Sequence, residues 1–425
     1  MTGEQRSAAG PWAPPAAVPP ALLERPRRRG NVLFTVLVSI AMLVGAAVMC
    51  LVLVLLDAPD AVAVGALLAA LPVGPLLACF AWLDRYEPEP VPLLLTAFGW
   101  GALVATAAAL VLQLADRTIL GTPDSVTGVV VAPITEEGAK GLFIVLLLVS
   151  RRRVIDGVLD GIVYAGFVGV GFAFTENILY LGSAYMGGGD NGPGGIGSAT
   201  TLFVVRGVFS PFAHPLFTSF TGIGVGIAVV TRRRTLRFLA PVLGYVAAVI
   251  AHGSWNASAT FGGGLFLLTY LFAMVPAFLV LAGFALWARS REGRMLTRSL
   301  VDLSQRGLLD PAEVPWLVRL PARRASRRHA RGYGGSTGEK VMREYQQQAV
   351  ELGFLHDRYL RGTAPHDTAQ RGGQMVQRLR ALRPYVGFPQ GPRVPGPGLP
   401  GPGVPGPGVS GGRPQWGQQQ WGSQR

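Results

Sequence analysis

Eight apolar stretches, each about as long as a helix that crosses a lipid bilayer, fill most of the chain between residues 32 and 288. A transmembrane helix needs about 20 predominantly apolar residues. We therefore predict an all-α polytopic membrane protein with about eight transmembrane helices. The stretches lie at 32–56, 61–83, 91–115, 126–150, 154–181, 200–231, 236–257 and 264–288. Pro211 and Pro215 interrupt the sixth stretch, which favours a broken or re-entrant helix there.

The composition agrees with a membrane protein and argues against two other classes. Hydrophobic residues make up 50% and charged residues 15% of the 425 positions, which is too apolar for a soluble chain of this length. The net charge of +14 does not predict nucleic-acid binding, because many Arg residues flank apolar stretches, as the positive-inside rule expects. Cys50 and Cys79 have no partner at metal-ligand spacing, so neither a disulfide framework nor a cysteine zinc site is predicted.

The loop charges predict the orientation in the membrane. With eight spans, the basic loops fall on the side of the N-terminus, and they contain Arg151–Arg153, Arg232–Arg234, Arg237, Arg289, Arg291 and Arg294. In the opposite loops Arg117 is the single basic residue. Basic residues are enriched in cytoplasmic loops. Both termini of this multi-pass membrane protein are therefore predicted to be cytoplasmic.

Composition also divides the chain into four regions. Residues 1–31 are predicted to be a disordered cytoplasmic leader, and 32–294 the transmembrane domain. Residues 295–388 form a basic, soluble cytoplasmic tail that is partly helical, with helix-compatible composition at 338–360 and 368–383 and loop-like sequence elsewhere. Residues 389–425 are Pro/Gly-rich and then Gln/Trp-rich, which is typical of disorder.

The stretch at 126–150 carries three charges near its middle: Glu136, Glu137 and Lys140. Each charge at the centre of a membrane helix costs roughly 2.5–3.5 kcal/mol, so the segment needs internal compensation. Lys140 follows Glu136 by four residues and Glu137 by three, and can therefore pair with either carboxylate on the same helical face. It cannot neutralise both, and one carboxylate is left for chemistry or for a proton.

The three spans that follow also carry polar side chains at positions where lipid-facing residues would be apolar. These side chains are Glu176 and Asn177, then Arg206 and His214, and finally His252 and Asn256. Intramembrane ionisable groups face a bundle interior or a wet cavity. We therefore predict that the four spans converge on one polar cavity. Counting the helical rise from the poorly charged loops places Glu136 about 15 Å deep and Glu176 and His252 about 8 Å deep, in the outer half of the bilayer.

Such a cavity suits a hydrolase, by either of two routes. A glutamate in it can take a proton from water and return it to the leaving amine. Alternatively, Glu176, His214 and His252 could hold a divalent metal such as zinc, whose bound water would be the nucleophile. The first route is favoured because the chain has no His-Glu-x-x-His pattern, but both stay open. Two other classes also fit buried acids and imidazoles: a proton- or ion-coupled carrier and a catalytically silent membrane scaffold.

Five ordered motifs between residues 83 and 256 resemble the PrsW family of bacterial intramembrane proteases. They are Leu83-Asp-Arg-Tyr-Glu-Pro-Glu-Pro90, Pro133-Ile-Thr-Glu-Glu-Gly-Ala-Lys140, Asp160-Gly161 with Gly171-Phe-Ala-Phe-Thr-Glu-Asn177, Arg206 with His214, and His252-Gly-Ser-Trp-Asn256. The resemblance implies that 32–294 is a protease-like domain. It also implies an endopeptidase that cuts a membrane-anchored substrate near the outer face, such as an anti-sigma factor in stress signalling.

The family is similar to the type II CAAX prenyl endopeptidases and the bacteriocin-processing membrane proteases, and this likeness implies roles for single residues. Glu136 would be the general base, with Glu137 beside it, and His252 with Asn256 would stabilise the oxyanion. This sequence departs from those relatives at Glu176, where they have a His, and at Lys140, where they have an Arg one position later. The partner in water activation is therefore Glu176, His214 or a metal held by both. Lys140, Asn177 and Arg206 would support the site.

Overall fold

The computed structural model describes residues 18–19, 32–151, 154–188 and 192–389. Within these ranges every regular element is a helix, as predicted. The described residues form two compact units. The membrane unit contains residues 32–296 with 360–363, and the C-terminal unit contains 297–359 with 364–389. The predicted disordered leader, apart from Val18 and Pro19, and the predicted disordered tail beyond 389 lie outside the described residues.

Seven helical segments among the described residues are long and apolar enough to cross a membrane. Several consist of two helices in line, in places joined by a π-helical turn, labelled η. The segments are Val32–Leu56 (α2), Pro59–Leu83 (α3 and α4), Val91–Leu120 (α5, η1, α6 and η2), Val158–Met186 (α9), Gly195–Val230 (α10, η5 and α11), Arg234–Phe261 (α12) and Gly263–Gln305 (α13, η6 and α14). They agree with seven of the eight predicted spans.

The eighth predicted span, 126–150, is helical as well. The short α7 (Asp124–Val126) leads into a π-helical turn, η3 (Thr127–Val131), and then into α8 (Ala132–Ser150). Because it carries three charged residues, this segment is not one of the seven apolar segments described above. Glu136, Glu137 and Lys140 are all buried inside the protein, and Glu137 and Lys140 are fully inaccessible. The segment therefore avoids the cost of charge in lipid by placing its charges in the protein interior.

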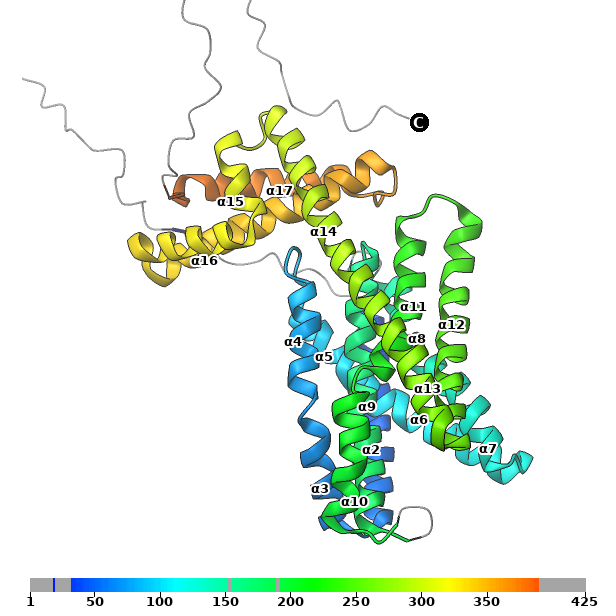
Figure 1. The fold of residues 1–425 in the computed structure, drawn as a ribbon. Coiled ribbons are helices and arrows are strands. Elements are labelled where there is room, and N and C mark those ends of the chain that lie inside the picture. Colours follow the sequence, from blue (N-terminus) through cyan, green and yellow to red (C-terminus); the bar gives the residue numbers. More distant parts are fainter. Residues whose placement is uncertain (1–17, 20–31, 152–153, 189–191, 390–425) are drawn as a thin grey trace, which may run out of the picture. The chain divides into compact units, whose positions relative to one another are not determined.

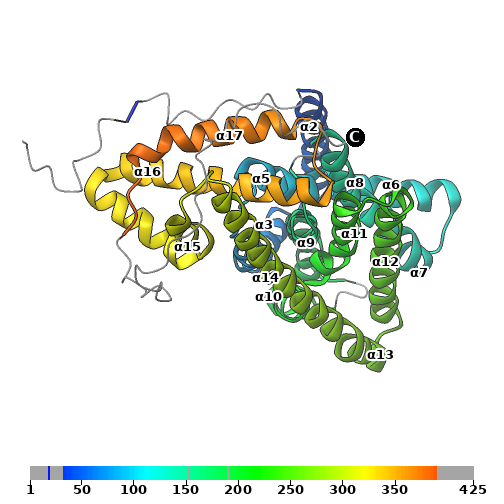
Figure 2. The ribbon, with the colours of Figure 1, turned by 90° about the horizontal axis from the view of Figure 1, so that it is seen from above.

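Helix α9 lies at the centre of the membrane unit and is buried along most of its length. It packs against α3, α5 (Val91–Gly99), α10 and α11 (Figures 1 and 2). Glycines allow this close packing: a Cβ at Gly161 would lie 2.1 Å from the carbonyl oxygen of Gly222 on α11. A small residue at such a contact lets two membrane helices approach backbone to backbone. The close packing brings the polar residues of α9 and α11 together.

The segment with the two prolines is a broken helix, which was one of the two forms favoured above. Helix α10 (Gly195–Phe203) continues into η5 (Val204–Phe209) and stops at Ser210, and α11 (Ala213–Val230) begins three residues later. Ser210 has non-helical backbone angles, φ −125° and ψ 35°. The residue before a proline is disfavoured in the α region, which accounts for a break directly before Pro211. The break places Arg206 and His214 on separate helical pieces.

The C-terminal unit is more helical than predicted. The helices expected at 338–360 and 368–383 are present within α16 (Leu320–Arg361) and α17 (Thr368–Leu382). The loop-like interpretation of 295–337 is wrong: α14 (Val275–Gln305) extends through its first part, and α15 (Val314–Val318) and the start of α16 occupy most of the rest. Leu296, Leu300 and Leu303 recur at helical spacing and are buried, and this period was overlooked among the Arg residues.

Candidate active site

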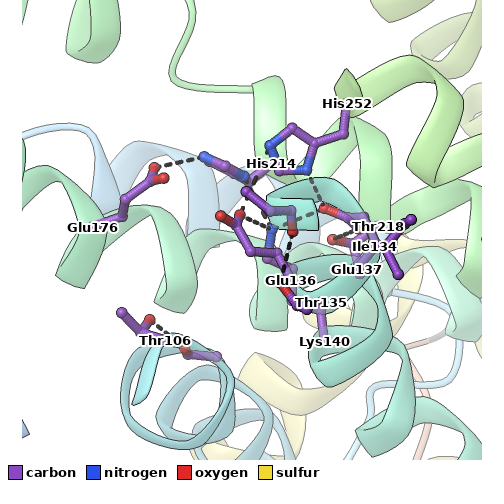
Figure 3. A network of polar contacts seen from close by, with 12 residues as sticks. Thr106, Ile134, Thr135, Glu136, Glu137, Lys140, Glu176, His214, Thr218 and His252 are labelled. Atoms are coloured by element: carbon purple, nitrogen blue, oxygen red, sulfur yellow. Dashed lines mark hydrogen bonds and ion pairs between the residues drawn. The ribbon is translucent and has the colours of Figure 1, made fainter. Parts of the chain in front are cut away.

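The structure brings together ionisable side chains from four helices in the interior of the membrane unit (Figure 3). Glu136, Glu137 and Lys140 come from α8, Glu176 from α9, His214 from α11 and His252 from α12. These helices are neighbours in the packed bundle. The shared interior position predicted for these side chains is therefore present, although their separation in sequence exceeds 100 residues.

Glu137 holds the centre of this cluster. Its Oε1 accepts a hydrogen bond from Lys140 Nζ at 2.8 Å and lies 3.0 Å from His252 Nδ1. Its Oε2 accepts a hydrogen bond from the Thr218 hydroxyl at 3.0 Å. Both oxygens are therefore engaged, and the side chain is completely buried. Glu137 acts as the anchor of the His252 ring and leaves the other ring nitrogen, Nε2, to face Glu136.

Glu136 is the less firmly bound of the two adjacent glutamates. Its Oε2 lies 3.4 Å from Lys140 Nζ and 3.7 Å from His252 Nε2. Its Oε1 accepts a hydrogen bond of 3.3 Å from the amide of Gln113 on α6 (Thr106–Ala115). The prediction that Lys140 cannot fully neutralise two acids agrees with this difference in distance. Glu136 is therefore the carboxylate with room to bind a further group.

Lys140 is surrounded by partners from three helices. Besides the two glutamates, its Nζ lies 3.1 Å from His214 Nδ1 and 3.6 Å from the centroid of the Phe172 ring. A buried ammonium group needs such compensation, because desolvation of an unpaired charge costs several kcal/mol. An ammonium group is a donor, so His214 Nδ1 is the acceptor in this contact and the His214 proton lies on Nε2. Lys140 thus fixes the tautomer of His214, and a metal bound at Nδ1 would take the place of the hydrogen bond from Lys140.

Glu176 contacts His214 at Nε2, the ring nitrogen that does not face Lys140. The Nε2 of His214 donates to Glu176 Oε2 at 2.8 Å, and Arg206 pairs with the same carboxylate. Arg206 also donates to Asn177 Oδ1 at 2.7 Å and lies over the Tyr180 ring. The sequence left open whether Arg206 belongs to the site or only reaches toward the membrane surface. These contacts place Arg206 beside the candidate site, where it binds both Glu176 and Asn177.

Asn256, unlike the other residues predicted to be catalytic, makes no hydrogen bond or ion pair to the acids or imidazoles in the described structure. Its Nδ2 donates to the carbonyl oxygen of Gly128 at 2.9 Å, which ties α12 to η3. Gln113, in contrast, contacts Glu136 but was not predicted. A neutral amide in an otherwise apolar span was the signal that could have identified it, because polar side chains in membrane helices need a partner.

Three of these side chains have the chemistry and spacing of a metal site. Glu136, His214 and His252 are buried and offer ligand atoms that all lie within 4.8 Å of one another. Two imidazoles and one carboxylate are a common catalytic zinc ligand set. Each imidazole is also held by a carboxylate at its other side, His252 by Glu137 and His214 by Glu176. Carboxylates of this kind orient metal-binding histidines. The residues therefore fit a divalent metal, with Glu136 in place of the predicted Glu176.

A second group of acids lies around the loop between α4 (Val73–Leu83) and α5. Asp84 accepts a hydrogen bond of 2.6 Å from the backbone amide of Glu89, and Glu89 accepts one of 2.8 Å from the Tyr164 hydroxyl. Burial raises the pKa of Asp84 to about 7, and the charge of Asp156 adds to this effect. Burial likewise raises the pKa of Glu89 well above its ordinary value. The hydrogen bonds of Asp84 and Glu89 therefore cap this loop.

This loop gives a pH-dependent prediction for stability. A carboxyl whose pKa is higher in the folded state than in the unfolded state stabilises the fold at low pH, and that stability is lost as the pH rises toward the folded pKa. For Asp84 the window runs from about pH 4 to about pH 7. We expect Asp84→Asn to leave the unfolding free energy unchanged below about pH 4, where the wild-type carboxyl is protonated in both states, and to raise it at pH 8 by ~1–3 kcal/mol. Equal melting temperatures of wild type and variant at pH 8 would contradict this.

Comparison with known proteins gives the same result as the motifs. Residues 89–281 match the family described as PrsW family intramembrane metalloprotease. The chain is 30% identical over 162 residues to Protease PrsW of Geobacillus kaustophilus and 27% identical over 182 residues to that of Bacillus subtilis. These alignments cover 37% and 43% of the chain.

The aligned parts span 65% of the length of the first relative and 76% of the second. Protease PrsW of Clostridioides difficile is 32% identical over 113 residues, which is 25% of the chain and 47% of that relative. No solved structure matches the chain significantly. The matched region contains the whole cluster from Glu136 to His252. Residues 89–281, which are somewhat less than half of the chain, therefore form a region that is similar to the PrsW family of intramembrane metalloproteases.

Proposed function

We propose that the chain is a metal-dependent endopeptidase that hydrolyses a peptide bond of a membrane-anchored protein. The observation that supports it most directly is the buried group of Glu136, His214 and His252 inside a bundle of membrane-length helices. The family description as metalloproteases agrees with a metal at this position. Zinc is the proposed metal, because it binds imidazole and carboxylate ligands and has no redox chemistry of its own.

The charge balance of the site favours a bound cation. Three carboxylates, Glu136, Glu137 and Glu176, face two basic groups, Lys140 and Arg206, so the cluster carries one excess negative charge when its histidines are neutral. An uncompensated charge inside a membrane protein is costly. This negative excess attracts a divalent cation to Glu136 and the two imidazoles, where its two positive charges would leave the cluster with a net charge of +1. Glu136 would then be the carboxylate that, by the sequence argument, Lys140 does not neutralise.

The residues of the chain would divide the work as follows. Glu136, His214 and His252 would hold the metal, which when bound polarises a carbonyl group and activates water. Glu137 fixes the orientation of His252 through Nδ1, and Glu176 fixes that of His214 through Nε2. Phe217 stacks on the His252 ring with centroids 4.9 Å apart and limits its rotation. Orientation of this kind keeps the reacting geometry fixed before substrate arrives.

We propose a membrane-anchored substrate because a peptide bond must reach side chains that are buried among membrane helices. Following the family resemblance, an anti-sigma factor with a single span is the proposed example, cleaved near the outer face of the bacterial cytoplasmic membrane. The poorly charged loops and the predicted cytoplasmic position of both termini support this orientation.

Removal of metal tests the proposal. We expect a chelator to lower the rate of cleavage of a co-reconstituted single-span reporter by at least about tenfold, because the catalytic group that activates water is withdrawn. Addition of Zn²⁺ in slight excess should restore the rate. Cleavage that is insensitive to the chelator but absent in Glu136→Gln would instead favour water activated by Glu136 alone. Reporter that stays intact under every condition would contradict the proposed activity.

A further inference from the structure

The two carboxylate oxygens of Glu136 have different partners, and this asymmetry is set by a residue outside the charged motifs. Oε2 faces Lys140 Nζ at 3.4 Å and His252 Nε2 at 3.7 Å. Oε1 accepts the amide hydrogen of Gln113 at 3.3 Å. Oε2 therefore points toward His252 and Lys140, whereas Oε1 is held by α6.

Gln113 is unusual for its helix. Residues 107–115 read Ala-Ala-Ala-Leu-Val-Leu-Gln-Leu-Ala, so Gln113 is their single polar side chain. It is half-buried, and Glu136 is the hydrogen-bond partner the described structure gives it. A primary amide is costly in an apolar span unless it is hydrogen-bonded. The position of Gln113 thus needs an explanation, and its contact with Glu136 supplies one.

We propose that Gln113 is the positioning residue of Glu136: its amide holds Oε1 so that Oε2 stays directed toward the space between His214 and His252. The inference rests on the proposed metal site. A neutral donor is suited to this task because it fixes the carboxylate without cancelling its charge. A basic residue in the same place would compete with the metal for Glu136.

Lys140 offers Glu136 a competing ion pair, and the hydrogen bond from Gln113 limits it. Its ammonium group already lies 2.8 Å from Glu137 and 3.4 Å from Glu136. Without a donor at Oε1, Glu136 is free to rotate and to pair with Lys140 through both oxygens. The carboxylate would then be withdrawn from the two imidazoles. Loss of a residue that orients a metal ligand lowers metal affinity by about 10–100-fold.

A purely structural role would give a different result. Helices α6 and α8 pack against each other, so the hydrogen bond could serve only to join them. In that case its removal would lower the melting temperature and leave the metal affinity unchanged. Gln113→Met separates the two roles, because Met has nearly the same length, has no donor and is compatible with an apolar helix. Thr106→Val is the matched control, since Thr106 bonds within its own helix, to Gly101 O at 3.0 Å.

The experiment compares the full-length wild type, Gln113→Met and Thr106→Val, purified in detergent micelles. Zn²⁺ affinity is measured by competition with a chromophoric chelator, and kcat and KM are measured with the single-span reporter. We expect Gln113→Met to lose about 10–100-fold in Zn²⁺ affinity and to lower kcat at subsaturating metal with little change in KM. Thr106→Val should stay within about twofold of wild type in affinity.

The outcomes separate this inference from the proposed function. Wild-type Zn²⁺ binding by Gln113→Met, with or without a lower melting temperature, would overturn the positioning role and leave the metal site intact. A wild-type chain that neither binds Zn²⁺ nor cleaves the reporter would overturn the proposed function, and the positioning role with it. Equal losses in Gln113→Met and Thr106→Val would also overturn the inference, because they would show a general effect on α6.

Discussion

Glu136→Gln is expected to lower kcat for reporter cleavage by about 10²–10⁴-fold in a protein that folds and inserts normally. The amide has the size of the carboxylate and can still accept a hydrogen bond from Lys140. It cannot take up a proton from water, and it is a much weaker metal ligand. The loss is therefore expected whether Glu136 acts as a metal ligand or as the base.

The matched control for this change is Thr135→Val in the preceding position. The Thr135 hydroxyl donates to the carbonyl oxygens of Val131, at the end of η3, and Ala132, in α8, and takes no part in the contacts of Glu136. We expect its kcat to stay within about threefold of wild type. Turnover of Glu136→Gln at the wild-type rate, with normal expression and melting temperature, would contradict a catalytic role of Glu136.

Lys140→Met is expected to destabilise the membrane unit by about 3–5 kcal/mol, measured as a large fall in melting temperature in detergent. The reason is that Glu137 would keep a fully buried charge without its cation, which lies at 2.8 Å. The double variant Glu137→Gln with Lys140→Met removes both charges and should recover much of the loss. Strong non-additivity of this kind is typical of directly coupled pairs.

The control for this second change is an ion pair on the surface. Arg117 and Asp124 lie 3.2 Å apart with side chains that are 50% and 84% exposed. Arg117→Met should therefore cost less than about 1 kcal/mol. A Lys140→Met protein as stable as Arg117→Met would show that the buried cation is not required by Glu137.

The sequence predicted the helical class and the meeting of the charged residues because both follow from strong physical constraints. Apolar segments of membrane length have few alternatives to a helix. Ionisable side chains such as Glu136, Glu176 and His252 must avoid lipid, so they were expected to share an interior. The prediction required only that each charged side chain face inward, without knowledge of which atoms meet.

The finer features depended on rotations and contacts that a one-dimensional pattern does not contain. The metal candidates were predicted as Glu176, His214 and His252, whereas Glu136 lies with the imidazoles and Glu176 supports His214 from behind. Gln113 was missed because an uncharged residue in an apolar helix gives a weak signal. The helices of 295–337 were missed because Arg residues obscured the period of the buried leucines.

Anomalous diffraction at the zinc edge, from crystals of the Zn²⁺-loaded chain, tests the central claim most directly. We predict one strong peak at bonding distance from Glu136, His214 and His252, with Glu137 still hydrogen-bonded to the opposite ring nitrogen of His252. A map without a peak among these three residues, or with its peak on other ligands, would contradict the metal site on which the proposed function depends.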